Sequence, residues 1–345
     1  MSIRATHCGL AAGMLAALLT ALPEPTGARP QAPQNPPPSQ QPSQPPSPEP
    51  RERAQQPFKV QTNLINQFVT VRDKHNAILS DLAKSDFHVF EDGVEQKVEF
   101  FNKELNLPLT MGILVDTSGS MANMLPAEQE AATSFLEHVM IKGDLAAIIS
   151  FDKDSDLLTD FTGSVSELER GLNRARINEA YPRSTPGTVP DRNPRGTVFY
   201  EAIYLAAREK LATEVGRKAI IALTDAVDEG SRIKRDEAIE AAQRVDAVVH
   251  VLLIADPHSY WYQGSGAGVA QKIADETGGR MIEVRNEKNL AKAFQQLIEE
   301  LRSQYVLGYY PSNTAHDGHF RKIKIEVTTP DSRVLARKGY YAPKN

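Results

Sequence analysis

Cysteine is almost absent from this chain. Only Cys8 is a cysteine among the 345 residues. It precedes an Ala/Leu-rich apolar stretch, residues 9–22, that we interpret as the core of a secretory signal over residues 1–28. Without the signal, the mature chain would contain no cysteine, which excludes disulfides and thiol chemistry. We therefore expect a secreted, periplasmic or envelope-associated protein, with a retained amino-terminal anchor as the alternative.

Clustered positive charge and long apolar runs are also lacking. The net charge is −5 and the basic residues are scattered, so we expect no nucleic-acid partner. No segment after residue 28 is apolar enough for a membrane span, and we expect none in the mature chain. The chain has no Gly-x-Ser-x-Gly elbow, phosphate loop or Cys/His pair, and its eight histidines show no ligand spacing. These absences predict a protein that is not an enzyme.

Two kinds of sequence surround the central part. Residues 29–57 consist mainly of Pro, Gln, Ser and Glu, which predicts a disordered linker. Residues 58–106 and 304–345 instead contain short runs rich in β-branched and aromatic residues, separated by turn residues. Asp92 and Gly93 predict a hairpin turn between two such runs, residues 87–90 and 98–101. Further expected strands are residues 58–64, 68–71, 305–310, 322–327 and 334–337. We expect the two flanks to combine into one small β-sandwich.

Strand and helix patterns alternate in residues 107–303, which predicts an α/β domain with a doubly wound, mostly parallel sheet. The expected buried strands are residues 109–115, 145–151, 219–223, 247–254 and 280–284. The expected helices are residues 127–140, 165–176, 197–212, 234–245, 268–277 and 290–302. In the last helix, the apolar residues recur at helical spacing and predict a core-facing stripe.

The most informative feature is the apolar run of residues 111–115, which stops abruptly at Asp116. Two serines follow, Ser118 and Ser120. In a parallel sheet such a run is a buried strand, and its carboxyl end lies at the edge where α/β folds bind ligands. Carboxylate and hydroxyl oxygens suit a hard cation such as Mg²⁺ or Mn²⁺ better than zinc or copper. A helix-capping loop is the alternative, because Asp and Ser commonly accept hydrogen bonds from helix amides.

Two later segments join this one in an ordered set. Residues 195–202 contain Thr197, which opens an expected helix, and residues 221–225 end an expected strand at Asp225. The set resembles the metal-ion-dependent adhesion site of von Willebrand factor type A domains. The resemblance covers roughly residues 107–303, and the flanks with their Pro-rich leader are similar to bacterial secreted proteins of the related group. Ala226 departs from the glycine that usually follows the second aspartate.

The resemblance implies a function. In this family Asp116, Ser118, Ser120, Thr197 and Asp225 would hold Mg²⁺, with Mn²⁺ or Ca²⁺ as other candidates. A Glu or Asp of a protein partner would complete the shell of the ion. The chain would then be a divalent-cation-dependent adhesion or protein-binding module. A metal-dependent hydrolase using the same site, and a structural scaffold with a merely stabilising ion, remain as alternatives.

Two other segments carry polar or aromatic residues near the same edge. Asp152, Asp154 and Asp156 imitate the start of a calcium loop, but Leu157 replaces the required glycine, so we interpret them as a solvated hairpin turn. Tyr260, Trp261 and Tyr262 follow an expected buried strand. They are candidates for a partner-binding surface, since Tyr and Trp are favoured in binding hot spots, or for a local cap.

Overall fold

The computed structural model describes residues 64–103, 108–177, 196–254 and 265–344. The predicted signal over residues 1–28, the linker over residues 29–57 and nearly all of the expected strand at residues 58–64 lie outside the described residues. The aromatic residues Tyr260, Trp261 and Tyr262 also lie outside them. These predictions remain predictions.

A six-stranded sheet forms the centre of the α/β part, in the order β10-β9-β8-β5-β6-β7. All neighbouring pairs are parallel except β6 and β7. The strands are β5 (Leu109–Asp116), β6 (Leu145–Phe151), β7 (Ser155–Thr162), β8 (Arg217–Thr224), β9 (Ala247–Ile254) and β10 (Met281–Val284). Every residue of β5 is buried, as its near-continuous apolar sequence predicts for a central parallel strand. The predicted fold class is confirmed.

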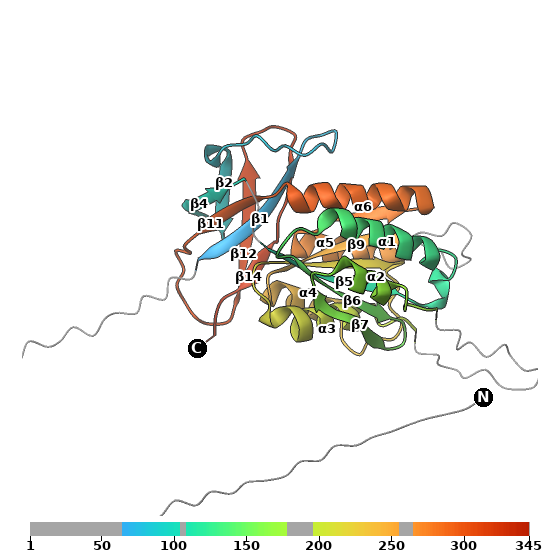
Figure 1. Cartoon of the computed structure of the whole chain (residues 1–345). Coiled ribbons are helices and arrows are strands. Elements are labelled where there is room, and N and C mark those ends of the chain that lie inside the picture. Colours follow the sequence, from blue (N-terminus) through green and yellow to red (C-terminus); the bar gives the residue numbers. More distant parts are fainter. Residues whose placement is uncertain (1–63, 104–107, 178–195, 255–264, 345) are drawn as a thin grey trace, which may run out of the picture. The chain divides into compact units, whose positions relative to one another are not determined.

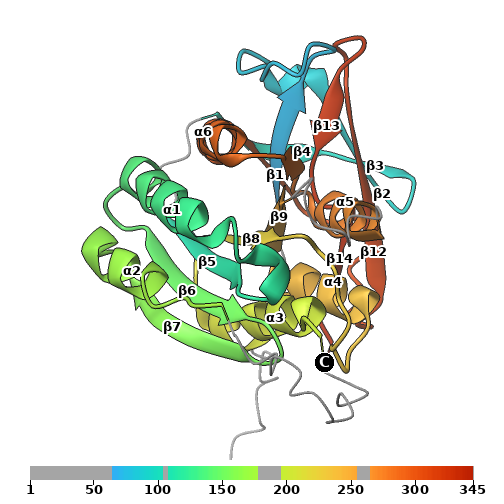
Figure 2. The same cartoon turned by 90° about the vertical axis from the view of Figure 1, so that its right-hand side faces the viewer.

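Helices cover both faces of this sheet (Figure 2). One face packs against α1 (Leu125–Val139), α2 (Val165–Leu172) and α6 (Glu287–Arg302). The other packs against α3 (Phe199–Leu205), α4 (Arg235–Arg244) and α5 (Ser265–Thr277). After α3 the chain continues through a π-helical turn (Ala206–Lys210) and a 3-10 turn (Leu211–Thr213). Of the helices in the described residues, none is both long and apolar enough to cross a membrane.

Strands from both flanks of the chain interleave in two further four-stranded sheets, beside the α/β part in Figure 1. One sheet has the order β13-β1-β11-β4 and the other β14-β12-β2-β3. The amino-terminal flank supplies β1 (Ile65–Arg72), β2 (Phe87–Glu91), β3 (Val94–Gln96) and β4 (Val98–Asn102), with a 3-10 turn at Lys84–Asp86. The carboxyl-terminal flank supplies β11 (Tyr305–Tyr309), β12 (Phe320–Val327), β13 (Arg333–Leu335) and β14 (Gly339–Tyr341).

Buried residues of both sheets form one hydrophobic cluster, which includes Val69, Val89, Leu307 and Ile323. The two flanks therefore build the small β part together. The domain boundaries at residues 106/107 and 303/304 stay a prediction.

The hairpin in the amino-terminal flank differs from the predicted one. Asp92 and Gly93 form the expected turn, with φ of 48° and 85°. A two-residue turn with both φ values positive pairs the strand with the residues that follow at once. β2 therefore pairs with β3, with Glu91 opposite Val94. The run predicted at residues 98–101 is β4, which pairs with β11 in the other sheet.

Candidate metal centre

Asp116 is the last residue of β5, in the middle of the sheet. Its side chain is fully buried. One carboxylate oxygen accepts a hydrogen bond from the amide of Ser118 at 2.9 Å, and the other accepts one from the hydroxyl of Thr224 at 2.6 Å. Because Thr224 ends β8, the neighbouring strand, these bonds fix the carboxylate between two strand ends.

The two serines lie in the loop that follows β5. A 3-10 turn, Gly119–Met121, occupies this loop, and α1 begins only at Leu125. Ser118 precedes the 3-10 turn without a side-chain capping bond, and Met124 occupies the capping position of α1. The hydroxyl oxygens of Ser118, which is half-buried, and Ser120, which is exposed, lie 3.0 Å apart. The helix-capping alternative therefore does not account for either hydroxyl.

Asp225 lies directly after β8 and is half-buried. Its carboxylate accepts a hydrogen bond from the amide of Val227 at 3.0 Å, and Thr224 accepts one from the amide of Ala226 at 3.0 Å. Ala226 has φ of 57°, in the left-handed region. This conformation costs a residue with a Cβ atom about 1–2 kcal/mol, which explains why glycine is usual at this position.

Thr197 is half-buried and lies two residues before α3. The amides of Glu229 and Gly230 donate to its carbonyl oxygen at 3.1 and 3.2 Å. A Cβ atom at Gly196 would collide with the side chain of Glu229, so only glycine allows the two loops to approach this closely. The main chain thus holds Thr197 against the loop that follows Asp225.

The structure also settles how α3 begins. The helix was expected to begin at Thr197, but it begins at Phe199 with Val198 at the capping position. The first amides of α3 donate to other groups: that of Tyr200 to the carboxylate of Asp228 at 2.9 Å, and that of Glu201 to the hydroxyl of Ser231 at 3.1 Å. Thr197 is therefore not the helix cap.

The acidic segment forms the hairpin between β6 and β7, as expected from the missing glycine: Asp152 and Asp154 lie in the turn, and Asp156 lies in β7. Asp152 contributes to the site indirectly, because its carbonyl oxygen accepts a hydrogen bond from the amide of Val198 at 2.7 Å. The loop that carries Thr197 is therefore attached to the sheet from two sides.

The charges of the site act against one another. Burial, followed by the charge of Asp225, raises the pKa of Asp116 to about 7, although hydrogen bonds from Ser118 and Thr224 act in the opposite direction. The nearby negative charge of Asp225 thus adds to the cost of ionising the buried Asp116. A divalent cation would remove this repulsion.

Sequence reasoning did not single out two residues beside the candidate site: Thr224, which bonds Asp116, and Glu128, whose pKa responds to Asp116 and Asp225. Glu128 lies in the first turn of α1, and its side chain is 1% exposed. Among the described residues, neither of its carboxylate oxygens has a hydrogen-bond partner. Burial, then the charges of Asp116 and Asp225, raises the pKa of Glu128 well above its ordinary value. The available signal was its place on the core-facing stripe of α1, where a carboxylate is unusual.

The donor set fits a hard cation. It consists of carboxylates and hydroxyls, and the buried charge of Asp116 lacks a cationic neighbour among the groups that act on its pKa. In the described part of the chain, no three acidic, histidine or cysteine side chains converge closely enough to hold a metal by themselves. Serine and threonine hydroxyls, water or an outside ligand would have to complete the shell.

Comparison with known proteins confirms the family resemblance over the central segment. Residues 111–227 match the von Willebrand factor type A domain. This match includes Asp116, Ser118, Ser120, Thr197 and Asp225. No curated protein sequence matches the chain.

Several solved structures are similar to parts of the chain. The conserved hypothetical protein BatB from Bacteroides thetaiotaomicron is 20% identical, with 56% of this chain and 100% of that chain covered and a TM-score of 0.43. A von Willebrand factor type A protein from Catenulispora acidiphila is 13% identical, with 84% and 76% covered and a TM-score of 0.46. The vWF domain of the pili tip protein Mfa5 from Porphyromonas gingivalis is 13% identical, with 56% and 95% covered and a TM-score of 0.43.

Proposed function

We propose that this chain is a divalent-cation-dependent protein-binding module of the cell envelope or its exterior. Asp116, Ser118, Ser120, Thr197 and Asp225 would hold the cation, which we expect to be Mg²⁺, with Mn²⁺ or Ca²⁺ as substitutes. An Asp or Glu of a protein partner would complete the shell. When bound, the ion would supply a positive charge at the edge of the sheet. These residues would hold it there, and the carboxylate of the partner would bind to it.

The observation that supports this proposal best is the environment of the oxygen donors. Asp116 is fully buried with a raised pKa, while the nearby hydroxyls of Ser118 and Ser120 cap no helix. An ionised carboxylate in such a place is costly unless a positive charge accompanies it. Mg²⁺ prefers six oxygen ligands and gives up its waters reluctantly, so a partly protein-held ion keeps positions that an outside carboxylate can take.

Binding of the cation is tested by calorimetric titration of the full chain with Mn²⁺ and with Mg²⁺. We expect a single site in the wild type and no measurable heat in Asp116→Ala. Asp154→Ala is the matched control, because it removes an exposed carboxylate from the neighbouring hairpin. Negligible heat in the wild type, or equal heat in all three proteins, would remove the cation site.

Recognition of an acidic partner is tested with immobilised chain and paired peptides that differ only by Glu or Gln. We expect the Glu peptides to bind the wild type in Mg²⁺. This binding should disappear in chelator, and it should also be absent in Asp116→Ala. If the cation binds but Glu and Gln peptides behave alike, the ion only stabilises the loop. Cation-dependent phosphatase or esterase turnover that Asp225→Ala abolishes would instead indicate a hydrolase.

A further inference from the structure

The packing of α1 does not explain why an acidic side chain stands at Glu128. The neighbouring positions of the same stripe, Leu125, Ala132 and Phe135, are apolar and belong to the core. A buried polar group without a hydrogen-bond partner is destabilising by about 1–3 kcal/mol, and a charged one by more. A leucine or methionine at this position would avoid that penalty. Core packing therefore does not account for the carboxylate, and we look for a functional role.

The surroundings of Glu128 connect it to the candidate metal centre. The helix that carries it follows the loop of Ser118 and Ser120, and the acidic groups that act on its charge are Asp116 and Asp225. No arginine or lysine is among those groups. Glu128 is thus a buried carboxylate with two unpartnered oxygens, on a helix whose neighbouring stripe positions belong to the apolar core of α1 and the sheet.

We propose that Glu128 is a further carboxylate of the cation site, which contacts the ion through a bound water on the side facing the core. This inference rests on the proposed function. Water mediation is the arrangement that fits, because no three acidic side chains of the described residues converge at direct ligand spacing. Mg²⁺ usually keeps several waters, and each is a strong donor to a nearby carboxylate. Glu128 would position such a water and add negative charge beneath the ion.

The decisive variant is Glu128→Gln, which keeps the shape of the side chain and removes its charge. Mn²⁺ affinity is measured by calorimetry on the full chain, and unfolding is measured in chelator. Mutation of residues that orient metal ligands typically costs 10–100-fold in affinity, so we expect a loss of about that size. In chelator we expect unfolding at the same or a higher temperature, because a buried carboxylate has been removed.

Glu130→Gln is the matched control, since it removes the same charge from an exposed position of the same helix. It should bind Mn²⁺ as the wild type does. Glu128→Asp keeps the charge, and we expect it to retain more affinity than Glu128→Gln. If Glu128 had only a structural role, Glu128→Gln would not lose Mn²⁺ affinity while keeping its unfolding temperature in chelator.

Three results would overturn the inference. The first is wild-type affinity in Glu128→Gln, and the second is an equal loss in Glu130→Gln. The third is a loss of affinity that accompanies an equal loss of stability in chelator, because Glu128 would then act through folding. The wild type and Asp116→Ala, titrated in parallel, separate these results from failure of the proposed function. If the wild type binds no Mn²⁺, both proposals fail.

Discussion

Buried carboxylates at the two ends of the central sheet differ in whether they have a cationic partner. At the amino end, Glu300 and Asp144 are 1% and 2% exposed, and both pair with arginines. Arg72 lies 2.8 Å from Glu300, and Arg302 pairs with Asp144. At the carboxyl end, Asp116 and Glu128 are equally buried, and no described arginine or lysine forms an ion pair with either. The chain thus supplies its own positive charge at one end only.

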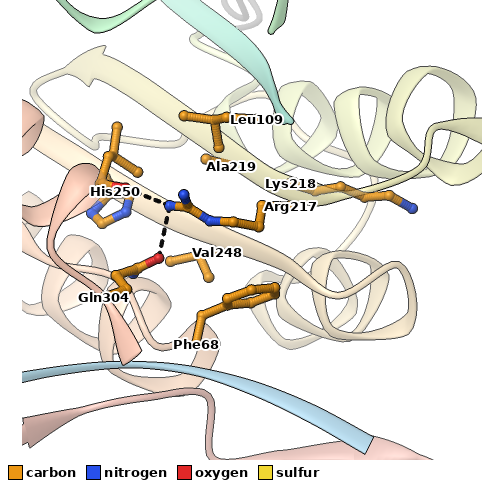
Figure 3. Close-up of a pocket in the computed structure, with 9 residues that line it drawn as sticks. Phe68, Leu109, Arg217, Lys218, Ala219, Val248, His250 and Gln304 are labelled. Carbon is orange, nitrogen blue, oxygen red and sulfur yellow. Dashed lines mark hydrogen bonds between the residues drawn. The ribbon is translucent and has the colours of Figure 1, made fainter. Parts of the chain in front are cut away.

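The amino end is also the place where the α/β part meets the β-sandwich. The guanidinium of Arg217 donates hydrogen bonds to the carbonyl oxygen of Leu301, near the end of α6, and to the side-chain oxygen of Gln304 (Figure 3). It also lies over the ring of Phe68 from β1. The cavity between these residues and His250 measures about 10 Å³. A space of that size holds one water at most, so the gap around Arg217 is not a ligand pocket.

The difference teaches how to separate structural from functional carboxylates. A buried carboxylate that only supports the fold is accompanied by a partner, because an unpaired buried charge is strongly destabilising. Where the chain leaves such groups without a cationic side chain, the carboxylate either keeps a proton or takes a cation from solution. This contrast is the physical basis of the proposed cation site.

The largest expected effect comes from breaking the pair at the amino end with Arg72→Met. Glu300 would keep only Arg280, at 3.6 Å. Removing one partner of a buried ion pair typically destabilises a protein by about 3–5 kcal/mol, and we expect a loss of this order in urea unfolding with unchanged Mn²⁺ affinity. Lys97→Met, which breaks an exposed pair with Glu99, should leave the stability nearly unchanged. Equal effects of both variants would contradict the comparison.

Asp116→Asn should act in the opposite sense at the carboxyl end. Because the variant lacks a buried charge, we expect it to unfold in chelator at the same or a higher temperature than the wild type. In saturating Mg²⁺ the order should reverse, since only the wild type gains stability from binding, about 2.7 kcal/mol at 100 times the dissociation constant. Thermal unfolding with and without chelator measures both values. A variant less stable than wild type in chelator would indicate that Asp116 has a purely structural role.

The pH dependence of stability should differ between wild type and Asp116→Asn. The pKa of Asp116 in the folded chain is raised from 3.8 to about 7. The folded state therefore holds this proton more tightly, and the stability it contributes is complete below about pH 4 and lost as the pH rises through 7. In chelator, the wild type should lose stability relative to Asp116→Asn between pH 4 and 7. Parallel curves over this range would rule out the raised pKa.

The smallest effect is expected for Ala226→Gly. Glycine adopts the positive φ of this position without strain, but it also increases the entropy of the unfolded chain. We expect a net gain between zero and about 1 kcal/mol, with no change in Mn²⁺ affinity. Urea unfolding measures the change in stability, and calorimetry measures the Mn²⁺ affinity. A clear loss of stability would mean that packing of the Ala226 methyl group outweighs the backbone strain.

Local patterns predicted most of the fold. The parallel strands and all six helices were recognised because each forms an apolar run or stripe of sufficient length. The edge strand β7 was missed, because its residues are half-buried or exposed and show no clean alternation. The partner of β2 was also wrong, since periodicity locates strands but does not decide which ones pair.

The sequence predicts candidate site residues only where they form a motif. Asp116, Ser118, Ser120, Thr197 and Asp225 stand in a recognisable order along the chain. Thr224 and Glu128 belong to no motif, and their roles depend on what the folded chain places beside them. Thr224 joins two strand ends through its hydrogen bond to Asp116. Glu128 stands out only because it is buried without a hydrogen-bond partner. Such information exists in three dimensions and not in sequence spacing.

The most direct test is a crystal structure of the chain grown with Mn²⁺, with anomalous diffraction to locate the ion. The account predicts one strong peak within ligand distance of Asp116 and the hydroxyls of Ser118 and Ser120. Water density should lie between that peak and Glu128. Absence of a peak at this edge of the sheet, with these side chains turned away from one another, would contradict the account.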